Sequence, residues 1–256
     1  MPTPNRSSLN PTAEDPALSV TVLGCDGSWP GPGGAGSGYL IASASTRVLI
    51  DAGPGTFANL QLRLDPASLD AIVITHAHAD HWTDLFGLDA HARFVLERTG
   101  IPLFGPGELR ERAPELAGRG TFEWRVVEGG NRIDIGDLCC SFRRTDHPVE
   151  TLAVRLEGSG RALGYSADSG PRWELADLGT GLDLALCEAT YTVEHEGTMG
   201  HLSGRQAGNQ ARDAGARRLV ITHRWPTVDE AVVGAEARAA FGAPIEHASI
   251  GAQFVL

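Results

Sequence analysis

The segment Thr75-His76-Ala77-His78-Ala79-Asp80-His81 constrains this chain more than any other, because it holds four potential metal ligands close together. On an α-helix, at about 100° per residue, these side chains would point in divergent directions, unlike the paired ligands of a helical HExxH motif. In a loop that leaves a strand, the first two can face one metal ion and the next two a neighbouring ion. Burying three histidines and an aspartate without such partners would be unfavourable. The segment therefore predicts a metal-binding loop.

Further candidates downstream favour a pair of ions, since a single catalytic ion needs only three protein ligands and a water molecule. They are His147, Asp168 and His223, and each follows an apolar segment. Any one of them alone would pass for an ordinary turn or surface residue. The tetrapeptide Val-Ile-Thr-His occurs at 73–76 and again at 220–223, so two apolar strands each end in a histidine.

The order of the predicted elements indicates one domain with a mixed sheet. Short β-branched or apolar runs separated by Gly, Pro and Asp predict strands, and longer periodic segments predict helices. The expected strands are 18–23, 39–42, 47–50, 71–75, a series between 132 and 165, 182–186 and 219–222. The expected helices are 83–98 and two that begin near 204 and 228. Interleaved strands and helices predict an α/β fold with helices on the outer faces of the sheets.

Length and composition fit a soluble protein with a single domain over 18–256, preceded by a disordered tail over 1–17. The tail has no hydrophobic stretch that would make it a signal peptide, and no apolar run is long enough to cross a membrane. The formal charge of −11 disfavours binding to nucleic acid, which depends on basic residues. The four cysteines lack CxxC spacing, so we expect buried reduced thiols in a cytoplasmic protein.

The ordered series HxHxDH, an isolated His, an Asp and a final His resembles the ligand order of the metallo-β-lactamase superfamily. Within it, the sequence is similar to the ribonuclease Z branch and to its relatives, the class II cyclic-nucleotide phosphodiesterases. The likeness runs from about Val20 to His223. The segments that carry it, besides the histidine-rich one, are 22–24, 37–40, 49–53, 147–152, 165–170, 187–190 and 201–203.

This resemblance implies an αββα sandwich with two divalent transition-metal ions at one edge, most naturally Zn²⁺, with Mn²⁺ or Fe as alternatives. It assigns His76, His78 and His147 to the first ion. It assigns Asp80, His81 and His223 to the second, with Asp168 bridging the two. By the same resemblance, Asp51 orients the histidine-rich loop.

The resemblance also implies hydrolysis, because two ions about 3.5–4 Å apart lower the pKa of a shared water and hold it as hydroxide. Asp80 would accept a proton as well as bind metal. In the family, the histidine matching His201 contacts the scissile phosphate and the glutamate matching Glu188 orients it. Together they would protonate the leaving alkoxide. Ser203 and Gln206 form a capping-box pattern, so His201 should lie just before a helix.

The expected substrate is a small phosphodiester such as a cyclic nucleotide. Ribonuclease Z enzymes of the common type carry a long tRNA-gripping arm between the isolated His and the bridging Asp, and the segment between His147 and Asp168 is too short to hold one. An RNA-processing nuclease and a hydrolase of a lactam, thioester, lactone or sulfate ester remain alternatives, as does a non-catalytic binding module. By analogy with relatives, we expect a homodimer.

A few features lie outside these motifs. The loop 31–36 formally fits GxGxxG, but a strand-like run follows it where a dinucleotide-binding motif needs a helix. We expect it instead to be a flexible loop at the rim of the site. His91, His195 and His247 match no motif, and of the three His195 is expected nearest the pocket.

Overall fold

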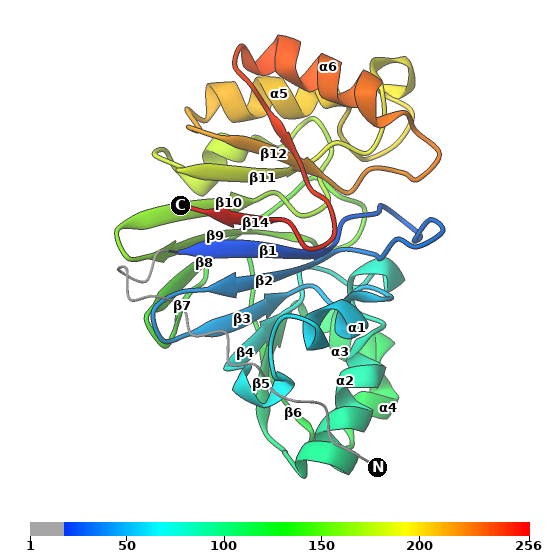
Figure 1. Cartoon of the computed structure of the whole chain (residues 1–256), viewed down its shortest axis with the longest axis vertical. Helices are drawn as coiled ribbons and strands as arrows, with labels where there is room; N and C mark the ends of the chain where they lie inside the picture. Colours follow the sequence, from blue (N-terminus) through cyan, green and yellow to red (C-terminus); the bar gives the residue numbers. More distant parts are fainter. Residues whose placement is uncertain (1–17) are drawn as a thin grey trace, which may run out of the picture.

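Two seven-stranded sheets packed face to face form the centre of the molecule (Figure 1). The computed structural model describes residues 18–256. In sheet order, the first sheet comprises β14 (Gln253–Val255), β1 (Ser19–Gly24), β2 (Gly38–Ala42), β3 (Arg47–Ile50), β4 (Ala71–Val73), β5 (Ile101–Gly105) and β6 (Phe122–Val126). The second comprises β13 (Glu246–His247), β12 (Leu219–Thr222), β11 (Leu184–Glu188), β10 (Arg161–Tyr165), β9 (Leu152–Gly158), β8 (Leu138–Arg144) and β7 (Arg132–Ile135).

Both sheets are antiparallel at one side and parallel at the other. In the first sheet β14, β1, β2 and β3 pair antiparallel, whereas β3 to β6 run parallel. In the second, β7 to β10 pair antiparallel and β10 to β13 run parallel. Antiparallel neighbours can be joined by a short turn, as β2 is to β3, whereas parallel neighbours need crossover connections. The two halves of the chain therefore repeat one plan.

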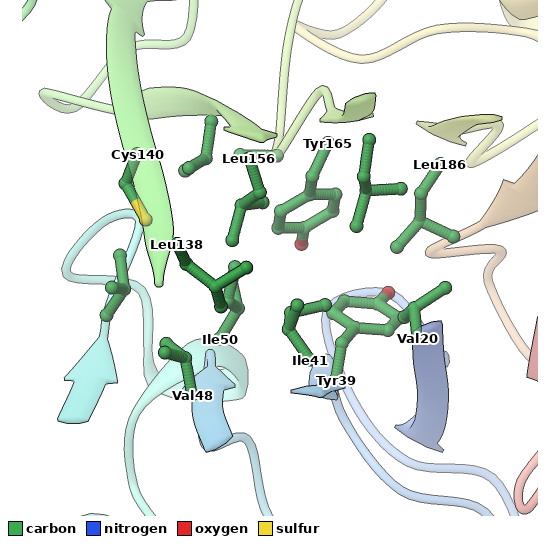
Figure 2. Close-up of a cluster of buried hydrophobic side chains, with 14 of the residues drawn as sticks. Val20, Tyr39, Ile41, Val48, Ile50, Leu138, Cys140, Leu156, Tyr165 and Leu186 are labelled. Carbon is green, nitrogen blue, oxygen red and sulfur yellow. The ribbon is translucent and has the colours of Figure 1, made fainter. Parts of the chain in front are cut away.

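The core between the sheets is made of side chains that alternate along the strands. In β8, residues 138, 140 and 142 are buried and those between them are half-buried, the pattern of a strand with one face against the core. Figure 2 shows this layer, in which Tyr39 of the first sheet meets Tyr165 of the second. The two rings pack edge to face with centroids 5.0 Å apart.

These two tyrosines also connect the sheets by hydrogen bonds. The Tyr39 hydroxyl is 2.6 Å from Thr222 Oγ1 at the end of β12, and the Tyr165 hydroxyl donates to Asp51 Oδ2 just after β3 at 3.0 Å. Each sheet thus fixes the end of a strand in the other. Both strand ends lead directly into the histidine site described below.

Helices cover the outer face of each sheet, each over its own apolar cluster (Figure 1). They are α1 (Thr56–Gln61), α2 (Leu85–His91), α3 (Gly107–Arg112) and α4 (Pro114–Ala117) on the first sheet, and α5 (Gly204–Asp213) and α6 (Glu230–Phe241) on the second. Short helical turns lie at Pro66–Ser68, Ala79–His81, Ala92–Leu96, Leu175–Leu178 and Val193–His195. This architecture confirms the expected αββα sandwich.

Several local expectations need correction. The expected helix over 83–98 is α2 followed by a wider π-type turn, and the strand expected at 182–186 lies two residues later, as β11. Segment 99–131, for which the sequence predicts no element, contributes β5, β6, α3 and α4.

The cysteines were expected to be buried, but two of the four free cysteines, Cys25 and Cys139, are only half-buried. The expected tail over 1–17 lies outside the described residues. Within 18–256, no helix is long and apolar enough to span a bilayer.

Candidate metal centre

The histidine-rich loop leaves the carboxyl end of β4 and is held in place by Asp51. One carboxylate oxygen of Asp51 accepts the backbone N–H of Thr75 at 2.8 Å. The other accepts the Thr75 hydroxyl at 3.0 Å and lies 2.8 Å from His81 Nδ1. Asp51 is fully buried, so these bonds replace the water it lost. The bond to Nδ1 leaves His81 Nε2 free to face a metal ion.

The seven expected ligands converge into two adjoining clusters. Within each cluster, one ligand atom per residue lies within 4.8 Å of all the others. The first cluster contains His76, His78, His147 and Asp168. The second contains Asp80, His81 and His223.

Asp168 faces both clusters, one carboxylate oxygen toward each. Its Oδ2 lies 3.5 Å from His76 Nε2 and 3.9 Å from His147 Nε2. Its Oδ1 lies 3.3 Å from both His81 Nε2 and His223 Nε2. This is the arrangement expected of a carboxylate that bridges two ions.

Within each cluster, nitrogen and oxygen atoms of different residues lie close together. In the first, His147 Nε2 lies 3.1 Å from His78 Nδ1. In the second, His223 Nε2 lies 3.3 Å from both Asp80 Oδ2 and His81 Nε2. The ring nitrogen of His147 that faces away, Nδ1, is 3.1 Å from the carbonyl oxygen of Gly200, which orients that ring.

Two buried atoms show that a cation fits between these side chains. His76 Nε2 and Asp168 Oδ1 are fully buried, and neither has a hydrogen-bond partner within 18–256. Leaving such atoms unpaired costs about 1–3 kcal/mol each. A cation in the first cluster would satisfy His76 Nε2, and one in the second would satisfy Asp168 Oδ1. Imidazole nitrogens combined with carboxylate oxygens suit zinc, manganese or iron.

The protonation states also suit metal binding. Burial lowers the pKa of His76, His78 and His147, so these imidazoles are neutral and present lone pairs. Burial would lower the pKa of His81 as well, but the carboxylates of Asp168, Asp80 and Asp51 raise it well above its usual value. A metal ion that binds His81 must therefore displace a proton.

The backbone is strained around the clusters. Among residues 18–256, six non-glycine residues have positive φ, and four of them lie here: Ser28 (62°), Asp51 (56°), Ala167 (51°) and His223 (53°). Such conformations are unfavourable for residues with a side chain and persist where the surroundings enforce them. Asp51, Ala167 and His223 turn the chain sharply just after β3, β10 and β12, next to the candidate ligands.

His201 lies beside both clusters and is paired with Glu188. Its ring centroid is 5.0 Å from that of His147 and 5.4 Å from that of His223. His201 Nδ1 is 3.2 Å from Glu188 Oε1. Burial would lower the pKa of His201, but the Glu188 carboxylate raises it to about 9. The capping box of Ser203 and Gln206 is formed at the start of α5, so His201 has the expected place before a helix.

Some residues at the site were not identified from the sequence. Thr190 Oγ1 donates to Glu188 Oε2 at 2.6 Å and lies 3.1 Å from His223 Nδ1, which links the two groups. The backbone N–H of Ser28 donates to Asp80 Oδ2 at 2.7 Å. Thr190 lies in the segment 187–190, which carries part of the family resemblance, so the sequence could have pointed to it. The contact of Ser28 is made by its backbone N–H and leaves no trace in the sequence.

The three remaining histidines do not join the clusters. His91 packs against Phe57, with ring centroids 5.5 Å apart. His195, expected nearest the pocket, is exposed at the end of the helical turn Val193–His195, beside Tyr191. His247 lies 3.7 Å from Glu230 and lines a separate cavity of about 230 Å³.

A cavity of about 600 Å³ opens beside His147. Arg144, Asp146 and Arg172 line it, together with residues 197–200. Asp146 Oδ2 accepts Arg172 Nε at 2.9 Å, so these two charges neutralise each other. The guanidinium of Arg144 has neither a hydrogen bond nor an ion pair to any part of the chain that the structure describes. The cavity therefore carries an unpaired positive charge next to a candidate metal ligand.

Comparison with known proteins places this geometry in a family. Residues 46–224 match the model of the beta-lactamase superfamily domain, a span that contains all seven candidate ligands. The Mycobacterium tuberculosis protein Rv1339 is 35% identical over 249 residues, which cover 91% of this chain and 90% of that protein. A ribonuclease Z of Thermoplasma volcanium is 26% identical over 282 residues, covering 88% and 93%.

A solved structure agrees over nearly the whole chain. The Bacillus subtilis protein named "Probable metallo-hydrolase YhfI" is 29% identical over 212 residues, covering 80% of this chain and 86% of that one. The crystal structure of YhfI, a metallo-beta-lactamase fold protein, superposes with a TM-score of 0.87 at 26% identity and covers 93% and 99% of the two chains. The chain therefore belongs to the beta-lactamase superfamily, as a metallo-hydrolase of the metallo-β-lactamase fold.

Proposed function

We propose that this chain is a binuclear metal-dependent phosphodiesterase that hydrolyses a small phosphodiester such as a cyclic nucleotide. The observation that carries the proposal is the position of His201. This histidine is kept protonated by Glu188 and lies beside two ligand clusters that share Asp168. The cleavage of an unactivated phosphodiester needs charge neutralisation together with a proton donor for the leaving alkoxide.

The ligands divide between two ions. His76, His78 and His147 would hold the first, Asp80, His81 and His223 the second, and Asp168 both. Bound divalent ions, Zn²⁺ by preference, supply acidification of water and neutralisation of the charge on phosphoryl oxygens. Asp80 Oδ2 accepts the Ser28 amide, which fixes this carboxylate at the edge of the second cluster. There it can accept a proton from the attacking water.

His201 and Glu188 act on the leaving group. Nδ1 of His201 faces Glu188, so Nε2 is the atom that can donate a proton. Glu188 in turn is held by the backbone N–H of Ser169 at 2.5 Å and by that of Leu202 at 3.2 Å. Bound dications would lower the pKa of His201 from its value of about 9 toward neutrality by Coulomb repulsion, which suits a general acid.

The surroundings favour a small anionic substrate. The hairpin of β9 and β10 fills the segment between His147 and Asp168, where a tRNA-gripping arm would have to be inserted. Arg144 gives the adjoining cavity a positive charge in a chain whose formal net charge is −11. The 26% identity to ribonuclease Z favours an RNA-processing nuclease as the second candidate.

The test combines metal analysis with a panel of substrates. We expect about two transition-metal ions per chain, and chelation should abolish hydrolysis that added Zn²⁺ or Mn²⁺ restores. Bis(p-nitrophenyl) phosphate, 2′,3′- and 3′,5′-cyclic nucleotides, precursor tRNA and nitrocefin are then compared side by side. Cleavage of nitrocefin or precursor tRNA ahead of the cyclic nucleotides would contradict the proposal.

The matched variants for this test are Asp80→Ala and Asp84→Asn. Asp80→Ala should lower turnover at least 10³-fold while the circular dichroism spectrum stays unchanged. Asp84 lies in the same part of the chain but outside both clusters, where it accepts the Phe57 amide at 2.8 Å, so Asp84→Asn should stay active. Fewer than one ion per chain after zinc loading, or an active Asp80→Ala protein, would exclude the binuclear mechanism.

A further inference from the structure

Two tryptophans from distant parts of the chain lie side by side at the metal centre. Trp29 belongs to the glycine-rich loop between β1 and β2, and Trp225 follows His223 closely. Their ring centroids are 5.7 Å apart, with the planes inclined by 39°. Trp225 Nε1 donates a hydrogen bond to Ser28 Oγ at 3.0 Å, which joins the two segments.

Both tryptophans are anchored to the second ligand cluster. Ser28, the neighbour of Trp29, donates its N–H to Asp80 Oδ2 at 2.7 Å. Gly27 donates its N–H to the carbonyl of Arg224 at 3.0 Å. A Cβ at Gly27 would lie only 2.5 Å from the His223 carbonyl oxygen, so the loop can approach His223 this closely only with glycine at that position.

The aromatic row continues toward His201. The ring of Tyr191 lies 6.4 Å from that of Trp225, and its hydroxyl donates to the His201 carbonyl at 2.5 Å. Tyr191 is fully buried and Trp225 half-buried, whereas Trp29 is 43% exposed. The aromatic row therefore connects the loop that contacts Asp80 with the loop that contains His201. Trp29 is the end of the row that is exposed to solvent.

The exposure of Trp29 has no explanation within the described part of the fold. Trp82 and Trp173 are buried, Trp124 and Trp225 are half-buried, and Trp29 alone among the five tryptophans is exposed. Its position is nevertheless fixed by the contacts with Trp225 and through Ser28. A rigid, exposed aromatic ring beside a site for a phosphodiester is suited to stacking against a planar group of the substrate.

We infer that Trp29, supported by Trp225, is the stacking surface for the base of a nucleotide substrate. This inference rests on the proposed function and narrows the small phosphodiester to one that carries a nucleoside. Stacking is sequence-tolerant, because every base has a π-face. The site should therefore prefer nucleosides strongly over simple alkyl esters and discriminate little between adenine and the other bases.

A binding experiment tests the stacking surface without turnover. Zinc-loaded protein is titrated by calorimetry with adenosine 5′-monophosphate and with ribose 5-phosphate, which carries a hydroxyl group in place of the base. The nucleotide should bind about 10-fold more tightly, and Trp29→Ala should remove most of this difference. Trp29→Phe should retain most of it. Phe94→Ala is the matched control, because Phe94 is an aromatic residue, 75% exposed, on a different segment.

A kinetic experiment uses two esters with the same leaving group, thymidine 5′-(p-nitrophenyl phosphate) and methyl p-nitrophenyl phosphate. In the parent protein kcat/KM should favour the nucleoside ester about 10-fold. Trp29→Ala should bring the two esters close together, chiefly by raising KM for the nucleoside ester. If the binding experiment is repeated with a pyrimidine monophosphate, a loss in Trp29→Ala that is confined to adenosine 5′-monophosphate would overturn the base-tolerant part of the inference.

The outcomes separate this inference from the proposed function. If neither ester is cleaved but the base still contributes to binding through Trp29, the phosphodiesterase proposal fails and the stacking surface stands. If both esters are cleaved and Trp29→Ala changes neither binding nor KM, the stacking surface is excluded and the activity stands. Tighter binding of a short oligoribonucleotide than of the mononucleotide would overturn the assignment to a small substrate.

Discussion

At the level of residues, the carboxylate of Asp168 joins the two candidate ligand clusters into one centre. Its two oxygens face different sets of histidines at 3.3 to 3.9 Å. Asp51 supports the clusters indirectly, because its carboxylate holds the backbone of Thr75 and the ring of His81 in place. Because both carboxylates are buried, their hydrogen bonds and charges act with little screening by water.

The role of His201 can be tested through the basicity of the leaving group. His201→Ala should lower kcat for a phosphodiester with an alkoxide leaving group about 100-fold, because the alkoxide needs a proton. The loss with a p-nitrophenolate leaving group should be much smaller, since this anion leaves without protonation. The measurement is kcat for the two substrates at several pH values.

His195→Ala is the control for that experiment, because His195 is exposed and belongs to neither ligand cluster. It should change kcat for neither substrate. Equal losses for both substrates in His201→Ala would show that His201 positions the metal ligands rather than donating a proton. A metal content below that of the parent would show the same.

At the scale of elements, the candidate ligands follow the ends of strands. The two Val-Ile-Thr-His segments mark such strand ends: the first starts at the last residue of β4 in the first sheet, and the histidine of the second directly follows β12 in the second sheet. Both strands run parallel to a neighbour, so the carboxyl ends of each parallel half lie at one edge. Tyr39 and Tyr165 hold these edges together across the core (Figure 2).

The start of α5 provides a prediction at this scale. Ser203→Ala removes the acceptor of the Gln206 amide, and Asp229→Ala removes that of the Ala231 amide at the start of α6. Each should reduce the free energy of unfolding by about 1 kcal/mol, as measured by urea denaturation. Only Ser203→Ala should also lower kcat, because the chain just before α5 carries His201. An equal effect of both variants on kcat would contradict this link.

Segment 99–131 shows why part of the fold cannot be predicted from the sequence. The strand β5 is a short apolar run that contains a proline, and β6 has mostly exposed or half-buried side chains. Neither has the clean alternation by which a strand is recognised. Both are strands because pairing to β4 continues across the sheet, and that pairing is a long-range interaction.

For the molecule as a whole, the distribution of charge around the site affects the approach of an anionic substrate more than the net charge does. A formal charge of −11 repels an anionic substrate at long range, and the exposed guanidinium of Arg144 opposes this repulsion next to His147. Such steering weakens as salt shortens the screening length, which is about 10 Å at 0.1 M.

Arg144→Ala should therefore lower kcat/KM for an anionic phosphodiester on the order of 3- to 10-fold at low ionic strength, and less at high ionic strength. Arg143→Ala is the matched control. Arg143 is the neighbouring exposed arginine on β8, and its guanidinium donates to the Phe142 carbonyl at 2.9 Å. If kcat/KM shows the same salt dependence in both variants, substrate attraction depends only on the net charge of the molecule and not on the position of Arg144.

The sequence by itself determined the candidate ligands, their order and the family, because several candidates are close in sequence and the others follow recognisable strands. It also predicted the αββα sandwich, which the structure confirms. The tertiary structure alone decided which nitrogen and oxygen atoms meet, which cluster each oxygen of Asp168 faces, and that Trp29 lies against Trp225. Those contacts join residues far apart in the chain through loops without periodicity. Their geometry is therefore set by the packing of the two sheets and not by local preference.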